Sequence, residues 1–428
     1  MVLFSGPVRS KDQNTDWNRL PEHPLQKTGK RPREKNEAMW EIEVLGVCLQ
    51  FRRPFRTSSM TIRERNSVLV RIGTVGSEHK RPHRRTSQAA QEAKGQEESR
   101  SGWGECAPWP SVTAHTLEVL KALTHRLQSL PQVCDDLEDD ASNSGRISAA
   151  RTLRESMSAE IPDLYVRAAF DTALLDFQAR AEGISLCRLL GGPLEGEVPV
   201  NAVLGADETV AEAIAAVANG FETLKLKVGA ETPERDASRV GAVRAAVGDA
   251  VRLRVDANGA WTVDEAVLFL RSVEKHRLEM IEQPVPAQDV AGLAQVRASS
   301  SVPVVADEAL SDLESLHTLL RAGAMDGIMI KTHRVGGPTA ALALIEAARE
   351  AGLLVFVSSL FETAVGVAAA AHLAAAAGTS GAAGLATGQA FVRNVAVFPV
   401  QDGKLRLGGP GLGFTPTPVS GQTFSKVF

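Results

Sequence analysis

Charged side chains stand at the ends of several short apolar runs in the middle of the chain. Each run lies about one strand and one helix from the next, and the residues are Lys225, Lys227, Asp256, Glu282, Asp307 and Lys331. In a barrel of alternating strands and helices, the carboxyl ends of all strands meet at one rim. We therefore expect three carboxylates and three amines to gather there.

Three carboxylates on neighbouring strands would repel one another strongly in a partly dry site. A divalent cation removes this repulsion, and because every donor is an oxygen we expect Mg²⁺, with Mn²⁺ as the alternative ion. Asp256, Glu282 and Asp307 would be its ligands. The competing interpretation is that each carboxylate caps the helix after its strand. Asn258 either supports the metal ligands or is a turn residue.

The lysines suggest proton transfer. Side chains alternate along a strand, so Lys225 and Lys227 share one face, while Lys331 approaches from across the barrel. A lysine beside a metal ion and a second ammonium has a lowered pKa and can act as a base near neutral pH. Such a base could remove the proton next to a substrate carboxylate, because a bound cation stabilises the resulting enediolate. Lys227 and Lys331 would serve opposite faces of that carbon, although any one lysine could instead be a solvated charge.

The region around these residues alternates short apolar runs with amphipathic stretches. Eight strands separated by seven helices predict an α/β fold, a (β/α)7β TIM-type barrel over residues 191–390. A doubly wound open sheet is the alternative, but no Gly-rich dinucleotide turn follows the first strand. The expected strands are 199–203, 223–228, 251–256, 278–282, 302–306, 327–331, 353–358 and 383–386, and the expected helices are 207–219, 233–247, 262–275, 288–297, 311–322, 337–351 and 362–377.

Residues 39–190 predict a separate N-terminal α+β capping domain, with strands first and helices second. Strands are expected near 40–44, 67–73 and 102–106, followed by helices at 111–128, 145–158 and 163–182. Residues 76–100 form a charged insertion, and residues 1–38 a disordered tail after which Met39 is a candidate translation start. We expect residues 391–428 to return to the capping domain.

Composition limits the class of protein. The net charge is −4, so no basic surplus points to a nucleic-acid partner. The four cysteines form no Cys-x-x-Cys pair, which favours reduced thiols and a cytoplasmic location. The longest apolar stretch, 364–377, is Ala-rich and contains His372, as expected for a buried helix and not for a membrane span. The expected partner is a small-molecule carboxylate substrate.

Taken together, the motifs resemble the muconate lactonizing enzyme subgroup of the enolase superfamily over about residues 40–415. The residues that carry the resemblance are Lys225-x-Lys227, Asp256-Ala-Asn258, Glu282-Gln-Pro284, Asp307-Glu308 and Lys331. The resemblance implies an α+β capping domain on a (β/α)7β barrel, Mg²⁺ on the three carboxylates, and Lys227 and Lys331 as the acid/base pair. Family members are often oligomers, so a homo-oligomer is compatible with it.

Within the subgroup the chain is most similar to the o-succinylbenzoate synthases. This similarity implies a Mg²⁺-dependent carbon–oxygen lyase of menaquinone biosynthesis, in which Lys227 removes the α proton and assists syn dehydration. Lys331 would stabilise the intermediate, and the backbone of Ser358 and Ser359 would help hold a carboxylate, or these serines would cap the last helix. The motifs are Gly102-Trp-Gly-Glu105, Val198-Pro-Val-Asn201, Ser358-Ser359-Leu-Phe-Glu-Thr363 and Gly384-Leu-Ala-Thr387.

Two other functions remain open. N-succinylamino acid racemases use the same two lysines, and Lys331-Thr-His-Arg-Val-Gly-Gly337 is close to their pattern. Dipeptide epimerases are disfavoured, because they usually carry Asp-x-Asp at the eighth strand, where this chain has Leu385-Ala386-Thr387. A non-catalytic metal-bound barrel is the remaining hypothesis. We expect His333 to be a loop or surface residue.

Overall fold

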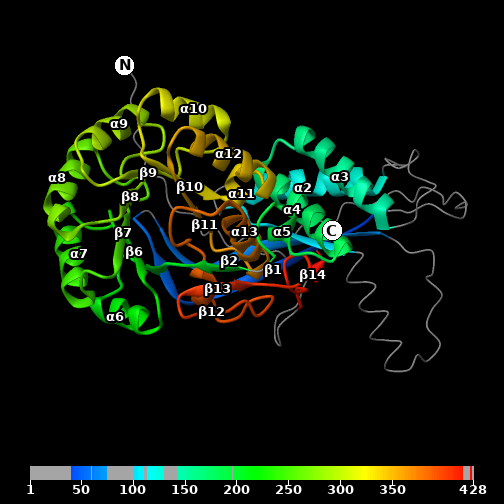
Figure 1. The fold of residues 1–428 in the computed structure, drawn as a ribbon, viewed down its shortest axis with the longest axis horizontal. Helices are drawn as coiled ribbons and strands as arrows, with labels where there is room; N and C mark the ends of the chain where they lie inside the picture. Colours follow the sequence, from blue (N-terminus) through cyan, green and yellow to red (C-terminus); the bar gives the residue numbers. More distant parts are fainter. Residues whose placement is uncertain are drawn as a thin grey trace, which may run out of the picture.

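The computed structural model describes residues 40–58, 60–74, 101–109, 113–129, 143–194, 196–417 and 425–426. The expected tail at 1–38 and the charged insertion at 76–100 lie outside these residues. Figure 1 shows a ring of strands and helices on one side and an antiparallel sheet with its own helices on the other.

A four-stranded antiparallel sheet forms in the order β14-β1-β2-β3. The three early strands are confirmed, but the first two are longer than expected. A register shift between Gln50 and Phe55 lets β1 bend and continue, as a bulge does. The strands are β1 (Trp40–Arg56), β2 (Thr61–Thr74), β3 (Ser101–Cys106) and β14 (Ser425–Lys426).

The helices beside this sheet are α2 (Thr113–Ser129), α3 (Asn143–Glu160), α4 (Leu164–Glu182) and α5 (Leu186–Leu189). Helix α4 packs directly on β3 at two glycines. A Cβ at Gly102 would lie 2.1 Å from the Ala173 carbonyl oxygen, and one at Gly104 would lie 1.9 Å from that of Ala169. Only glycine allows this close approach of backbones.

Seven parallel strands follow one another in chain order around a curved sheet. A doubly wound sheet would reverse its order partway, so that alternative is wrong. Nearly all side chains in these strands are buried, because helices cover one face and the barrel interior lies on the other. The strands are β5 (Ala202–Leu204), β6 (Thr223–Lys227), β7 (Arg252–Asp256), β8 (Met280–Glu282), β9 (Val304–Ala306), β10 (Gly327–Lys331) and β11 (Leu354–Ser358).

Residues 383 and 384 join the two edges of this sheet. Gly384 N donates to Val357 O at 2.8 Å on one side, and Ala383 N donates to Pro199 O at 2.7 Å on the other. The expected eighth strand at 383–386 is therefore present only as isolated bridges. The expected strand at 199–203 is divided, because β4 (Gly196–Pro199) leaves the barrel sheet to pair with β13 (Lys404–Leu407), which also pairs with β12 (Val400–Gln401).

The expected barrel helices are confirmed to within a few residues. Helices α6 to α10 line the side of the barrel away from α2–α5, whereas α11 to α13 lie toward them (Figure 1). None of the described helices is both long and apolar enough to span a bilayer. The helices are α6 (Val210–Ala218), α7 (Pro233–Val247), α8 (Val263–Val273), α9 (Val290–Ala298), α10 (Leu313–Arg321), α11 (Thr332–Val335), α12 (Pro338–Glu350) and α13 (Ala364–Ala377), with short 3-10 turns η2 (Glu274–His276) and η3 (Ala386–Ala390).

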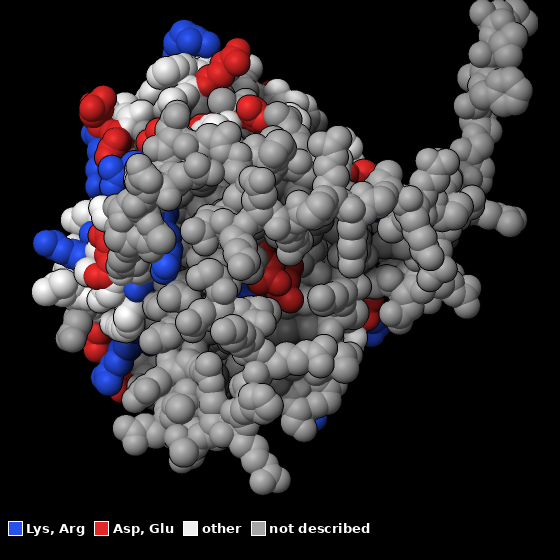
Figure 2. Space-filling model, turned by 90° about the vertical axis from the view of Figure 1, so that its right-hand side faces the viewer, with Lys and Arg blue, Asp and Glu red and all other residues white. Residues whose placement is uncertain are grey.

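The chain beyond η3 runs back along the antiparallel sheet. Val392 N donates to Gln50 O at 2.9 Å, and β14 pairs with β1. Leu412 N donates to the Asp176 carboxylate of α4 at 2.7 Å. Figure 2 shows acidic and basic side chains interspersed along the described part of its face, in keeping with 47 basic and 51 acidic residues.

Candidate active site

All six charged residues singled out in the sequence lie at the carboxyl ends of barrel strands β6 to β10. Each is nearly or fully buried, with the three carboxylates completely inaccessible. Strand register places Lys227 beside Asp256 and Asp256 beside Glu282. The predicted gathering of carboxylates and amines at one rim is therefore confirmed.

Lys225 and Lys227 meet on a single carboxylate, as expected for two residues on one strand face. Their amines lie 2.8 and 2.6 Å from Asp256 Oδ2. Lys225 also donates to Glu282 Oε2 at 2.6 Å. It thus joins two of the expected metal ligands.

Lys331 occupies the other side of the cluster. Its amine contacts Asp307 Oδ2 and lies 3.9 Å from Glu282 Oε1. The guanidinium of Arg334 donates to Asp307 Oδ1 at 2.5 Å. Arg334 was missed in the sequence, where only its position three residues after Lys331 could have indicated it.

The pKa values of these buried groups shift in different directions. Burial would lower the pKa of Lys225, but the charges of Asp256 and Glu282 outweigh burial and raise that pKa. Burial opposes ionisation of Asp256 and Asp307, yet adjacent Lys and Arg side chains hold both pKa values well below the usual range. Burial and the Asp256 charge raise the pKa of Glu282 to about 8.

The donor set fits a hard divalent cation. Three carboxylates contribute only oxygens, and Glu282 Oε1 is buried without a hydrogen-bond partner. In the described part of the chain no three acidic, histidine or cysteine side chains already converge as metal ligands. Lysine amines stand among the carboxylates instead, so Asp256 and Asp307 would exchange an amine contact for the ion.

The helix-capping alternative for the carboxylates is wrong. The side chains that cap the next helices are Thr262 for α8, Asp289 for α9 and Asp312 for α10. Asp256 Oδ1 accepts instead from Asn258 N at 2.9 Å.

Asn258 links two parts of the cluster. Its Oδ1 accepts from the Lys227 amine at 2.9 Å, and its Nδ2 donates to Glu308 Oε1 at 3.0 Å. It adopts a left-handed φ of 48°, so it is also a turn residue. Asn258 is thus a turn residue, and its contacts with Lys227 and Asp256 are compatible with support of the metal ligands.

Ser358 ends β11 and Ser359 follows it, and both contact the segment that closes the barrel. Ser359 N donates to Gly384 O at 3.2 Å, and its hydroxyl lies 2.7 Å from that of Thr387. The Ser359 amide is therefore not directed at the carboxylate cluster. The idea that the serines cap the last helix is wrong, because Thr363 is the N-cap of α13.

His333 is neither a surface nor a loop residue, contrary to expectation. It lies in α11 with 3% of its surface exposed. Its ring contacts Glu362 and the backbone of Glu105, so two motifs that are far apart in the sequence meet at this histidine.

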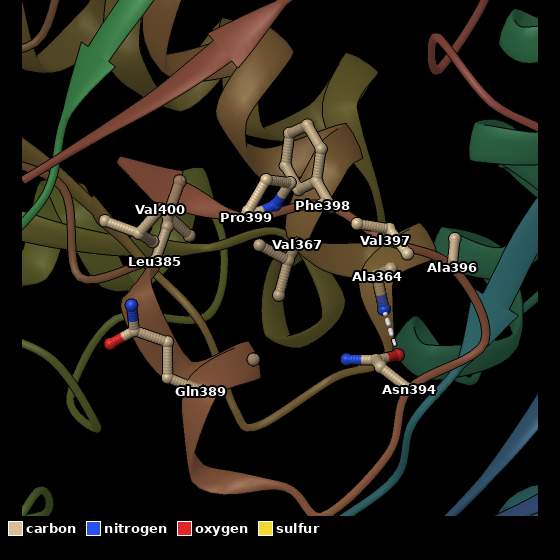
Figure 3. A pocket seen from close by; sticks show the side chains of 11 residues that line it. Ala364, Val367, Leu385, Gln389, Asn394, Ala396, Val397, Phe398, Pro399 and Val400 are labelled. Atoms are coloured by element: carbon tan, nitrogen blue, oxygen red, sulfur yellow. Dashed lines mark hydrogen bonds between the residues drawn. The ribbon is translucent and has the colours of Figure 1, made fainter. Parts of the chain in front are cut away.

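A surface pocket of about 150 Å³ lies elsewhere, between α13 and the segment 394–400. Figure 3 shows Val367, Phe398 and Val400 around it, with Asn394 accepting from Ala364 N at 2.8 Å. No carboxylate or lysine of the charged cluster lines it. We assign the chemistry to the cluster, because an apolar hollow offers no group that could move a proton.

Residues 208–419 match the family model described as enolase C-terminal domain-like. The chloromuconate cycloisomerase of Cupriavidus necator is 32% identical over 269 residues, which are 62% of this chain and 70% of that protein.

Two solved structures are similar over most of the chain. The N-succinyl Arg/Lys racemase from Bacillus cereus has a TM-score of 0.75 and 25% identity, covering 89% of this chain and 95% of that one. A dipeptide epimerase from Enterococcus faecalis, complexed with Mg and the dipeptide L-Leu-L-Tyr, has a TM-score of 0.73 and 28% identity over 88% and 99%. The chain therefore belongs to the enolase superfamily, and within it to the muconate lactonizing enzyme subgroup.

Proposed function

We propose that the protein is a Mg²⁺-dependent racemase or epimerase that moves the α proton of an N-acylated amino acid from one face of the carbon to the other. The observation that carries the proposal is that amines from β6 and β10 reach the same carboxylate cluster from two sides. Such an arrangement allows one lysine to remove the proton while the other delivers one.

In this proposal Asp256, Glu282 and Asp307 would hold the ion, which supplies positive charge to the substrate carboxylate as the α proton leaves. The neutral amine of Lys227 takes the proton from one face and becomes an ammonium. The ammonium of Lys331 returns a proton to the opposite face and becomes an amine. Lys225, whose raised pKa keeps it charged, remains an ammonium beside the cluster.

In this proposal the protein shares its function with racemases and epimerases and not with lyases. A racemase and a dipeptide epimerase are among the most similar solved structures, which favours this alternative over the o-succinylbenzoate synthase that the sequence motifs suggested. Proton return from the second lysine replaces the loss of a hydroxyl, so the same two lysines suffice.

An N-acyl substituent suits this site better than a free amine. The segment that closes the barrel continues as Leu385, Ala386 and Thr387, which are buried and carry no charge. A dipeptide brings a terminal ammonium, which is costly to bury without a carboxylate partner. An N-acyl group keeps the amide at the α nitrogen that a dipeptide also has, but it brings no ammonium that needs such a partner.

Proton exchange in D₂O tests the proposal. With Mg²⁺, we expect both enantiomers of an N-succinyl amino acid to gain α deuterium and interconvert, and chelation of the metal to stop this until Mg²⁺ is restored. Lys227→Gln and Lys331→Gln should each slow interconversion by at least about 100-fold. The exposed Lys404, which pairs with Glu197, provides the control Lys404→Gln.

Each contrary result has a distinct meaning. Deuterium exchange with dipeptides but not with N-succinyl amino acids would move the substrate to the dipeptide class. Dehydration of an o-succinylbenzoate synthase substrate faster than any racemisation would restore the lyase. Full activity in Lys227→Gln would refute the assigned acid/base pair.

A further inference from the structure

We propose that His333 and Glu362 form a positioning pair that holds Lys331 in place relative to the loop after β11. The proposal rests on the racemase function above, in which Lys331 serves one face of the substrate carbon. Neither residue touches the carboxylate cluster in the described contacts, so the pair would act through Lys331.

The geometry of His333 is the first support. Lys331 ends β10, and His333 follows it by two residues in the four-residue helix α11. Its Nδ1 lies 3.2 Å from Glu362 Oε1, and its Nε2 lies 2.8 Å from the Glu105 backbone oxygen. Both ring nitrogens thus lie near oxygens. Glu362 Oε1 accepts no hydrogen bond, and Nδ1 also lies 3.4 Å from the Thr332 hydroxyl, so a charged imidazolium would pair with the Glu362 carboxylate through its charge.

Glu362 connects the histidine to the second loop. Its other oxygen accepts from Leu360 N at 2.7 Å, so the carboxylate folds the loop back on itself. Between these residues Phe361 adopts a left-handed φ of 61°, a strained conformation for a bulky residue. The pair therefore joins α11, which directly follows Lys331, to the loop that begins at Ser359.

Strands β2 and β3 hold this second loop from outside the barrel. The Glu105 carboxylate accepts from Thr363 N at 2.8 Å and from Gly366 N at 2.9 Å. Buried Arg65 donates to Leu360 O at 3.2 Å. The space is tight, because a Cβ at Gly366 would lie 2.7 Å from His333 Cε1.

Lys227 is held differently, which makes the proposal specific. Arg239 of helix α7 contacts the Lys227 backbone oxygen and donates to Gly205 O at 3.3 Å. Helix α11, by contrast, has Lys331 as its N-cap residue and no side-chain cap. Loss of the His333–Glu362 contact should therefore displace Lys331 and leave Lys227 in place.

The test uses both enantiomers of N-succinyl-arginine in D₂O with Mg²⁺. Lys331→Gln first identifies the enantiomer whose α proton faces Lys331. In His333→Gln, whose side chain reaches only one of the two oxygens, exchange of that enantiomer should slow by about 10- to 100-fold. Exchange of the other enantiomer and both KM values should stay close to wild type.

His372→Asn is the matched control, because His372 is also fully buried but lies on α13 away from Lys331. It should slow neither enantiomer selectively. Equal slowing of both enantiomers in His333→Gln, or slowing of neither, overturns the proposal. If His333→Gln does not fold, Glu362→Gln keeps the shape of its side chain and decides by the same ratio.

A second measurement does not need the proposed substrate. Acetylation of wild type and variant with acetic anhydride, followed by peptide mass spectrometry, gives the labelling of Lys331 relative to Lys227. The positioning pair predicts a higher ratio in His333→Gln, and an unchanged ratio overturns it. If wild type exchanges no α proton of any N-succinyl amino acid or dipeptide, the racemase function fails while this ratio still tests the pair.

Discussion

Helices α6 to α10 and helices α12 and α13 surround the same barrel but begin in different ways. Each of the first five is capped by a side chain of its own N-cap residue, which are Thr209, Thr232, Thr262, Asp289 and Asp312. The N-cap residue of helix α12 is Gly337, which has no side chain, and Thr339 N of this helix donates to Asp171 of α4 at 2.8 Å. For α13, Glu105 of β3 accepts two backbone N–H groups in addition to the cap by Thr363.

The difference shows which barrel helices depend on contacts with β3 and α4. In α6 to α10 the first N–H groups donate to side chains of the same turn. In α12 and α13 some of them donate to carboxylates that are more than 160 residues away in the chain. The two lysines of the proposed mechanism fall on opposite sides of this division. Lys227 lies in the locally capped part, and Lys331 lies beside α11, where contacts with β3 and α4 begin.

The largest expected effect on stability comes from removing the Glu105 carboxylate, which caps α13 from a distant strand. Glu105→Ala removes the buried acceptor of two backbone N–H groups at the start of α13, those of Thr363 and Gly366, and of the Thr363 hydroxyl. We expect the free energy of unfolding to fall by about 3–5 kcal/mol, as for a broken buried charge network. Urea unfolding measures this free energy. A loss below about 1 kcal/mol would mean that the Glu105 cap stabilises the fold no more than a local cap does.

The pH dependence of the free energy of unfolding gives a second test, at His372 on α13. His372 is buried there, with its Nδ1 accepting from Cys187 N of α5 at 3.1 Å, and burial lowers its pKa from 6.5 to about 4. The unfolded chain binds this proton more readily, so its contribution to stability is lost as pH falls from about 6.5 toward 4. By pH 4 the loss should reach about 3 kcal/mol.

His372→Asn isolates this effect, because its amide oxygen can still accept from Cys187 N. The variant should show a smaller change in unfolding free energy between pH 6.5 and 4 than wild type. Parallel pH profiles for the two proteins would contradict the assignment of this proton to His372.

The smallest effect is expected for a local cap. Thr262→Ala removes the side chain that accepts from Glu265 N at the start of α8. Thermal and urea unfolding should show a loss of about 1 kcal/mol. Racemase activity should be unchanged, since α8 contributes no group to the proposed site, and a loss as large as that of Glu105→Ala would erase the distinction between the two sets of helices.

The sequence determined most of the elements and the charged cluster. Apolar runs with lysines or carboxylates at their ends predicted β6 to β10, and the barrel rule then placed Lys227, Asp256, Glu282 and Lys331 together. Local caps such as Thr262 with Glu265 can also be found from sequence, because their partners lie within one helical turn. In each case the deciding interaction spans only a few residues or follows from a repeated unit.

Only the tertiary structure decided how the cluster is held and how the barrel closes. His333 appeared to be a loop residue, since its partners Glu105 and Glu362 come from a distant strand and a later loop. Arg334 contacts Asp307 across two strands, and residues 383–384 close the sheet without forming a regular strand. Contacts between such distant segments depend on how whole elements pack, so they cannot be predicted from local hydrophobic periodicity.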